Sequence, residues 1–223
     1  LKSAKYLFGF MGYPKLVQLG TRLVPAMLKA GLPIKGIIRN TIFKQFVGGE
    51  TLAETIPVSQ MLSNYGVDVI LDYGVEGKEG EENFDHATQV FIDVINHAAS
   101  QKNIPFISIK VTGLASHELL QTLHEAPRLR SGIHDNEIEE AAWDRVRERM
   151  YAICEAAAEK NIGVLIDAEE SWIQDPIDRL TMEMRRCLTN KKQLYLIPFN
   201  YTVTTVYIFY ASLIKLQRRR VLF

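Results

Sequence analysis

Three short apolar runs in the second half of the chain end abruptly in charge. Residues 67–71 are followed by Asp72, residues 106–111 include Lys110, and residues 163–166 are followed by Asp167. A strand that is buried on both faces has a continuous apolar sequence, so a charged residue at its carboxyl end marks where the sheet meets solvent. In parallel α/β proteins this end of the sheet is where chemistry is done.

Apolar residues spaced three or four apart predict helices between these strands. The helices cover residues 83–100 and 137–160, and a further one opens at Asp175 and Pro176, while residues 125–136 look like an exposed excursion. Alternating strands and helices predict a parallel sheet, either a doubly wound layer or part of a (β/α) barrel. No GxGxxG sequence follows a strand, which argues against a dinucleotide-binding fold.

The first part of the chain has only helical patterns. Residues 4–30 predict one or two helices, and residues 34–46 predict another helical stretch. Thr51 and Glu54 form a capping box that opens a helix reaching about residue 64, in which Pro57 predicts a kink or a break. We expect this segment to pack on the main body rather than lie on a membrane, because its basic residues do not form one face.

Composition narrows the function classes. The 223 residues are 47% hydrophobic, with 26 basic and 26 acidic side chains, which suits one sizeable core and gives no support for a nucleic-acid partner. Cys154 and Cys187 lack metal-ligand spacing and are expected to be reduced core thiols. The five histidines share no spacing either, so no metal site is expected.

Four motifs in the same order carry a resemblance to a known family. They are FVGGET at 46–51, LDYGVEGK at 71–78, ISIKVTGLA at 107–115 and LIDAEESW at 165–172. Together they resemble proline dehydrogenase, most of all its single-function bacterial form, over about residues 4–190.

The resemblance implies a fold and an activity. The fold is the N-terminal half of a TIM-like (β/α)8 barrel, with a helical segment at 1–64 that packs on the barrel, barrel residues at 65–190 and an irregular tail at 191–223. The activity is oxidation of L-proline to 1-pyrroline-5-carboxylate by hydride transfer from proline C5 to FAD, the first step of proline degradation to glutamate. A membrane quinone or another electron acceptor is implied as a partner, with a location in the cytoplasm or peripherally at the inner membrane, and no nucleic acid or metal.

Three residues match the family's site. Lys110 matches the lysine that contacts the substrate carboxylate, Asp167 matches the active-site aspartate, and Ala168 has a backbone that touches FAD in the family. Their chemistry agrees, since a lysine at a strand end is a point cation suited to an anionic substrate and a nearby aspartate can fix its position. The alternative is that Lys110 and Asp167 form an ion pair that only closes the barrel end.

Other polar residues near the strand ends are expected to have structural roles. Asp72 and Glu76 would position loops, Glu169 and Glu170 would be loop carboxylates, and Trp172 would be a packing anchor.

The resemblance stops after Asn190. The family's next strand and the sequence from Gln193 onward can be encoded by one DNA string in adjacent reading frames, and Lys191 and Lys192 can be encoded by a run of adenines. We therefore expect residues 191–223 to be a frameshift product and the chain as written to be incomplete and inactive. The alternatives are a transmembrane segment at 194–214, a non-catalytic remnant or membrane-associated interaction protein, and another flavin-binding barrel such as a methylenetetrahydrofolate reductase.

Overall fold

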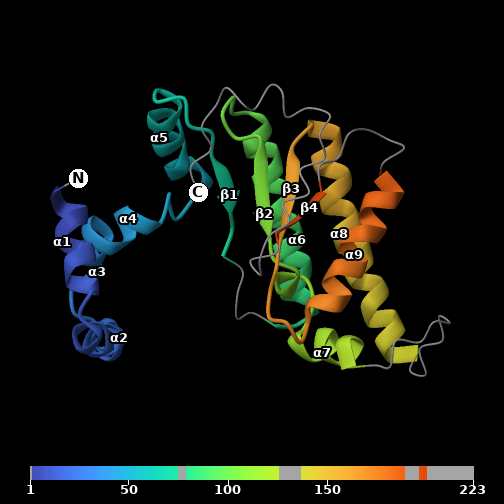
Figure 1. The fold of residues 1–223 in the computed structure, drawn as a ribbon, viewed down its shortest axis with the longest axis horizontal. Coiled ribbons are helices and arrows are strands. Elements are labelled where there is room, and N and C mark those ends of the chain that lie inside the picture. The colour runs from blue at the N-terminus through green and yellow to red at the C-terminus, as the bar shows by residue number, and fades with distance from the viewer. Residues whose placement is uncertain (1, 75–78, 126–136, 189–195, 200–223) are drawn as a thin grey trace. The chain divides into compact units, whose positions relative to one another are not determined.

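The computed structural model describes residues 2–74, 79–125, 137–188 and 196–199, and Figure 1 shows the order of the elements along the chain. Contacts between residues divide the chain into two compact units, residues 1–58 and 59–223, called here the N-terminal unit and the sheet unit. The domain boundary expected near residue 64 stays a prediction.

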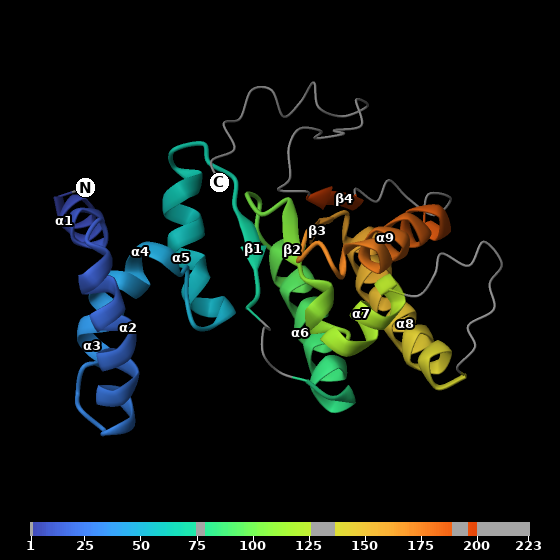
Figure 2. The ribbon, with the colours of Figure 1, turned by 60° about the horizontal axis from the view of Figure 1, so that its bottom comes forward.

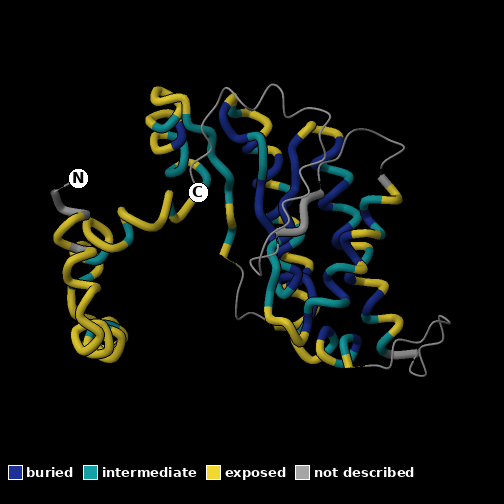
Figure 3. Tube along the Cα trace, viewed as in Figure 1, coloured by how far each residue is buried: buried dark blue, intermediate teal, exposed yellow. Residues whose placement is uncertain are grey.

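The N-terminal unit is helical, as its sequence predicts. Residues 4–30 form two helices, and the following stretch adds two short ones with a π-helical turn between them. The elements are α1 (Lys2–Met11), α2 (Pro14–Lys29), α3 (Lys35–Ile38), the π-helix (Arg39–Phe43) and α4 (Lys44–Phe46). Gly31 ends α2 with a φ of 74°, a left-handed conformation that glycine adopts without strain. From α2 through α4 no residue is buried, and Figure 3 shows these helices as almost entirely exposed.

At the start of α5 (Leu52–Ser63), Thr51 caps the helix as predicted, while Glu54 accepts from the residue before the cap instead of from Thr51 itself. The backbone N–H of Glu54 donates to Thr51 Oγ1 at 3.3 Å, and the backbone N–H of Glu50 donates to Glu54 Oε2 at 3.0 Å. Of the expected kink or break at Pro57, the break is wrong because the helix continues through it, and the kink stays a prediction. A proline frees the carbonyl four residues earlier, here that of Ala53, and this position is exposed, so water can satisfy the carbonyl.

The sheet unit is built on four parallel strands. They are β1 (Ile70–Asp72), β2 (Phe106–Ile109), β3 (Gly163–Asp167) and β4 (Leu196–Phe199), paired in that order. Parallel crossovers are right-handed, so strands that follow one another without reversal place all their helices on one face of the sheet. Figure 2 shows α6, α8 and α9 on one face. The result is an α/β fold with mostly helices and a small parallel sheet.

The presence of β4 corrects one expectation. Residues 191–223 were predicted to be an irregular tail, yet Leu196–Phe199 pairs in parallel with Val164–Asp167 of β3. A strand can form wherever a short apolar run lies beside the open edge of a sheet, and residues 196–199 are such a run beside β3. The rest of the tail, including most of the alternative transmembrane segment, lies outside the described residues. So does the predicted excursion at 125–136 except for Glu125, which is the last residue of α7 (His117–Glu125).

The helices of the sheet unit bury the predicted apolar stripes. In α8, Trp143, Val146, Met150, Ile153 and Ala157 are all buried, as expected. Cys154 is buried too, but Cys187 is exposed, so the expectation that both are core thiols is wrong for Cys187, which lies in the last turn of α9 beyond the packed part of its stripe. The helices are α6 (Glu81–Ala99), α7 (His117–Glu125), α8 (Glu137–Lys160) and α9 (Gln174–Leu188).

The two faces of the sheet differ in chemistry. Ile107, Ile109, Val164 and Ile166 are at most 1% exposed, which is the pattern of the face covered by helices. Side chains alternate along a strand, so residues 106, 108 and 110 lie on the other face, level with residues 163, 165 and 167 of β3. This second face, called here the open face, carries the polar residues of the sheet.

Candidate active site

Two of the predicted site residues lie at the carboxyl ends of neighbouring strands. Lys110 follows directly on β2, and Asp167 is the last residue of β3. Ile109 pairs with Ile166, so Lys110 and Asp167 occupy the next, equivalent level of the two strands. Both side chains are half-buried. Ala168 directly follows Asp167 in the chain. The fold thus brings the three predicted residues to the carboxyl ends of two adjacent strands. An ion pair between Lys110 and Asp167 stays a prediction.

Ser108 fixes the orientation of the Asp167 carboxylate. Its hydroxyl donates a hydrogen bond of 2.6 Å to Asp167 Oδ1, and Ser108 itself is only 7% exposed. A hydrogen bond to a charged acceptor is among the stronger ones, so this contact holds one of the two carboxylate oxygens in place. Sequence reasoning gave Ser108 no role, although a serine between two isoleucines of a buried strand is the one polar interruption in that run.

Glu169 joins the loops that follow β2 and β3. Its carboxylate accepts hydrogen bonds from the backbone N–H of Thr112 at 3.0 Å and from the Thr112 hydroxyl. Its own N–H donates to Gln174 Oε1 at 2.8 Å, at the start of α9. Burial raises the pKa of Glu169, against the opposing effect of the Thr112 hydrogen bonds and the Lys110 charge. We call this connection the Glu169–Thr112 bracket.

The bracket refines the expected roles of these residues. Glu169 is a structural carboxylate, in line with its predicted role, but it also sets the spacing between the loops that carry Lys110 and Asp167. Each bracket residue lies two positions after its site residue, with a single residue between them, so the bracket constrains both backbones close to the site. Trp172, expected to be a packing anchor, is 53% exposed, because the loop before α9 turns it outward from the core; that expectation is wrong.

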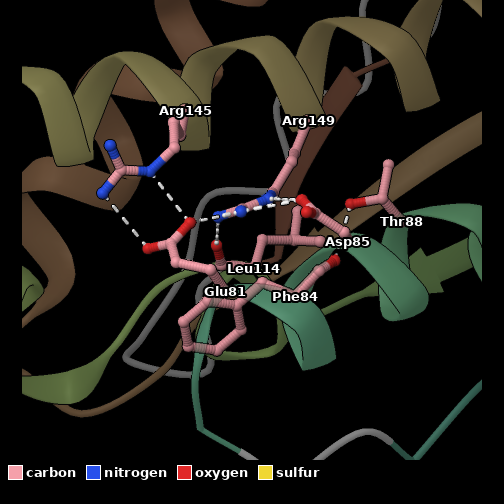
Figure 4. A network of polar contacts seen from close by, with 7 residues as sticks. All are labelled: Glu81, Phe84, Asp85, Thr88, Leu114, Arg145 and Arg149. Carbon is pink, nitrogen blue, oxygen red and sulfur yellow. Dashed lines mark hydrogen bonds and ion pairs between the residues drawn. The ribbon is translucent and has the colours of Figure 1, made fainter.

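A second network anchors the loop after β2 from the helix side (Figure 4). Arg149 of α8 is 6% exposed; its Nη1 donates to the carbonyl of Leu114 at 3.2 Å and its Nε donates to Asp85 Oδ1 at 2.8 Å. Its Nη2 also donates to Glu81 Oε2. The same oxygen accepts a hydrogen bond of 2.9 Å from Nε of Arg145. The pKa of Glu81 is lowered mainly by its hydrogen bond to Arg145 and, to a smaller extent, by its hydrogen bond to Arg149.

This network makes the loop after β2 part of the rigid body. The Arg149 guanidinium lies 5.5 Å from the centre of the Phe84 ring, so α6, α8 and the loop meet at one buried cation. Lys110 therefore stands on a backbone that is fixed at Leu114 by Arg149 and at Thr112 by Glu169.

The side chains at the strand ends offer one cation and oriented carboxylates. Over the residues that the structure describes, no group of three or more His, Cys, Asp and Glu side chains is placed to hold a metal ion. His124 of α7 has its Nδ1 3.8 Å from Asp175, in the first turn of α9. A half-buried lysine beside two carboxylates, one of them already engaged by Thr112, offers one cation for an anion and one oriented carboxylate.

Known proteins match this chain over most of its length. The sequence profile of the family described as proline dehydrogenase matches residues 56–211. The carbapenem antibiotics biosynthesis protein CarD of Pectobacterium carotovorum subsp. carotovorum is 31% identical over 141 residues, which are 63% of this chain and 36% of CarD. Mitochondrial proline dehydrogenase 1 of Dictyostelium discoideum is 26% identical over 209 residues, covering 76% of this chain and 36% of that protein.

A solved structure supports the fold. Proline utilization A (PutA) from Bdellovibrio bacteriovorus, inactivated by N-propargylglycine, superimposes with a TM-score of 0.51 at 15% identity, covering 67% of this chain and 16% of that one. At this identity the likeness bears on the fold alone. The chain spans about a third of the length of the first two relatives, 36% of each. With the profile matching more than half of its residues, this chain belongs to the proline dehydrogenase family.

Proposed function

We propose that the protein, with its reading frame restored after Asn190, oxidises L-proline to 1-pyrroline-5-carboxylate with Lys110 and Asp167 in the site, and that the chain as written is incomplete and inactive. The observation that carries this proposal is the placement of these two residues at equivalent levels of adjacent parallel strands, in a chain of the proline dehydrogenase family. Carboxyl ends of neighbouring parallel strands are where barrel enzymes gather their catalytic groups.

The side chains suit a zwitterionic substrate. Lys110 offers a compact cation to the proline carboxylate, in a half-buried place where Coulomb attraction is less screened than in water. Asp167, with one oxygen held by Ser108, keeps a fixed negative charge beside that cation and limits where the lysine can point. The bracket and Arg149 hold both backbones, so the charges are placed before substrate binds.

The same residues fit FAD as the cofactor. The strand-end backbone at Ala168 is half-buried and directly follows Asp167, whose carboxylate Ser108 orients, and the family resemblance assigns the FAD contact to this backbone. When bound, FAD would supply the hydride acceptor for proline C5. The role of this chain is to orient proline and to balance the charge of its carboxylate. A quinone or another acceptor then receives the electrons, at a cytoplasmic or peripheral inner-membrane location.

We further propose that the four strands are the first half of a (β/α)8 barrel. Their order follows the sequence without reversal, as in a barrel and unlike a doubly wound sheet, whose order reverses at a switch point. A four-stranded sheet has two edges and cannot close, so the site needs further strands for turnover. We also propose that residues 191–223 are the product of a frameshift after Asn190. The formation of β4 does not test this proposal, because an apolar run in either reading frame can form a strand.

One experiment tests activity and reading frame together. The coding DNA is sequenced across codons 190–193, and two proteins are expressed: the 223-residue chain and the version with the frame restored after Asn190. Flavin absorbance and L-proline-dependent reduction of a dye are measured for both. We expect the frame-restored protein to be yellow and active, and the 223-residue chain to be inactive. A frame-restored protein that holds FAD but leaves proline untouched would overturn the proposed function.

A further inference from the structure

Glu169 is an ionisable group that is partly withdrawn from water beside the proposed substrate site. It is half-buried and stands two residues after Asp167, whose own carboxylate is held by the Ser108 hydroxyl. Its neighbour Glu170 is exposed. A carboxyl group that has lost part of its water resists ionisation, so the charge of Glu169 depends on the other charges around it.

The charges that act on Glu169 come from the loops after β2 and β3. Burial raises its pKa most and the charge of Glu170 raises it further, whereas the charge of Lys110 lowers it. From α9, the neutral amide of Gln174 accepts a hydrogen bond of 2.8 Å from the Glu169 N–H and donates one of 2.8 Å to Asp178. Lys110 thus supplies positive charge that favours the ionised form of Glu169.

The Glu169–Thr112 bracket can persist in both protonation states of the carboxyl group. As a carboxylate, Glu169 accepts from the Thr112 N–H at 3.0 Å through Oε1 and from the Thr112 hydroxyl through Oε2. A hydroxyl group can donate or accept, so a protonated Glu169 can donate its O–H to Thr112 Oγ1 while its other oxygen still accepts from the N–H. Glu169 can therefore change its charge without releasing the loop after β2.

We propose that Glu169 takes up a proton when the carboxylate of a ligand binds Lys110, and so balances the charge of the site while the bracket holds the two loops. In the ligand-free protein, the Lys110 ammonium favours the ionised form of Glu169. A bound anion offsets that ammonium and adds a negative charge, and both changes favour the neutral form. The inference rests on the proposed function, because that function places the proline carboxylate at Lys110.

Ligand affinity should depend on pH as a result. If binding favours the protonated form of Glu169, protonation favours binding by the same factor, because linkage is reciprocal. Affinity is then highest below the pKa of Glu169 in the ligand-free protein, decreases as the pH rises through that value, and levels off above the higher pKa of the complex. We expect a decrease of about tenfold, which corresponds to about one pKa unit between the two states.

The test is the binding of cyclopentanecarboxylate to the FAD-loaded, frame-restored protein between about pH 5 and about pH 8. This acid keeps the ring and the carboxylate of proline but has no nitrogen, so it cannot be oxidised to an imine. Isothermal titration calorimetry gives the dissociation constant, and its repetition in buffers of different ionisation enthalpy counts the protons taken up. We expect proton uptake, of up to one proton per ligand, over the pH range in which affinity decreases.

Variants of the bracket separate a role in charge balance from a role in structure. Glu169→Gln presents an acceptor oxygen and N–H donors to Thr112, as the protonated carboxyl does. It should bind the acid at every pH as tightly as the wild type does at low pH, without proton uptake. The matched control Glu170→Gln removes an exposed carboxylate and should keep the pH dependence. Thr112→Val should extend tight binding to higher pH, and Thr112→Ser should behave as the wild type.

Two results would overturn the inference. One is parallel pH profiles for the wild type and Glu169→Gln, which would make Glu169 a structural residue only, and the other is no binding of the acid at any pH. Reduction of a dye by L-proline tests the proposed function separately. Proline oxidation with parallel profiles would refute only the inference, whereas proton-coupled binding of the acid without proline oxidation would support the inference and refute the function.

Discussion

The two units of this chain have equally clear helical patterns and opposite patterns of burial. In the sheet unit, Phe91, Ile95, Ile153 and Ile177 are at most 1% exposed, whereas α2 in the N-terminal unit has no buried residue. The difference lies in the strands, because α6, α8 and α9 each lead into a strand and pack against it. An amphipathic pattern therefore identifies a helix and its apolar face but does not identify what covers that face.

The largest contrast is expected from a charge placed in each unit. Ile107→Asp puts a carboxylate where the side chain is fully buried, which should destabilise the sheet unit by about 5 kcal/mol or more and prevent folding. Leu19→Asp puts the same charge on a side chain that is 53% exposed and should change the free energy of unfolding by less than about 1 kcal/mol. Thermal unfolding followed by circular dichroism measures both, and equal effects would contradict the contrast.

The next contrast is between two arginines of α8. Arg149→Met removes a buried cation, leaves the Leu114 carbonyl without its donor and should destabilise the chain by about 2–4 kcal/mol. Arg145→Met, whose side chain is 45% exposed, should cost about 1 kcal/mol or less. Urea unfolding of the two variants compares them, and a larger loss for Arg145→Met would show that burial does not decide the strength of this network.

A smaller effect should follow the protonation of Glu169. Burial raises its pKa above 4.5, so the folded state holds this proton to higher pH than the unfolded chain does. Its contribution to stability is complete below the ordinary pKa and decreases as pH rises from there to the raised value. In Glu169→Gln this decrease should disappear. In Thr112→Val it should extend to higher pH, because a hydrogen bond that favours the carboxylate is lost.

The Glu169 prediction is checked by urea unfolding of the wild type and both variants at several pH values between about 4 and 7. Parallel stability curves for the wild type and Glu169→Gln would show that the carboxyl titrates alike in the folded and unfolded states.

The smallest effect distinguishes the two cysteines by reactivity alone. Burial raises the pKa of Cys154 to about 12, whereas Cys187 is exposed. Iodoacetamide at neutral pH should therefore alkylate Cys187 in the native protein and reach Cys154 only after unfolding. Peptide mass spectrometry of native and unfolded samples reads out both sites, and native alkylation of Cys154 would indicate that α8 opens readily.

The sequence predicted the elements of the sheet unit better than their surroundings. The three strands and the stripes of α6 and α8 follow from periodicity, because their burial is a local consequence of the alternation of strands and helices. Helix α7 received no bounds, since it is short and lies beside the excursion. The exposed sides of Trp172 and Cys187 could not be predicted, because an apolar residue at an element's end has no periodic partner to fix its direction.

The candidate site was predictable only in part, and for a similar reason. Lys110, Asp167 and Ala168 stand in motifs, so their positions could be read from the chain. The partners that hold them lie far away along it: Ser108 is 59 residues from Asp167, and Thr112 is 57 residues from Glu169. Such contacts depend on strand register, which the sequence of one strand does not specify.

The most direct test of the account is the L-proline dependence of dye reduction in the frame-restored protein and its lysine variants. Lys110→Met should remove proline oxidation and Lys102→Met, an exposed lysine of the same unit, should retain it, with both variants still holding FAD. Equal activity in the two variants would contradict the placement of the substrate site at the carboxyl ends of β2 and β3.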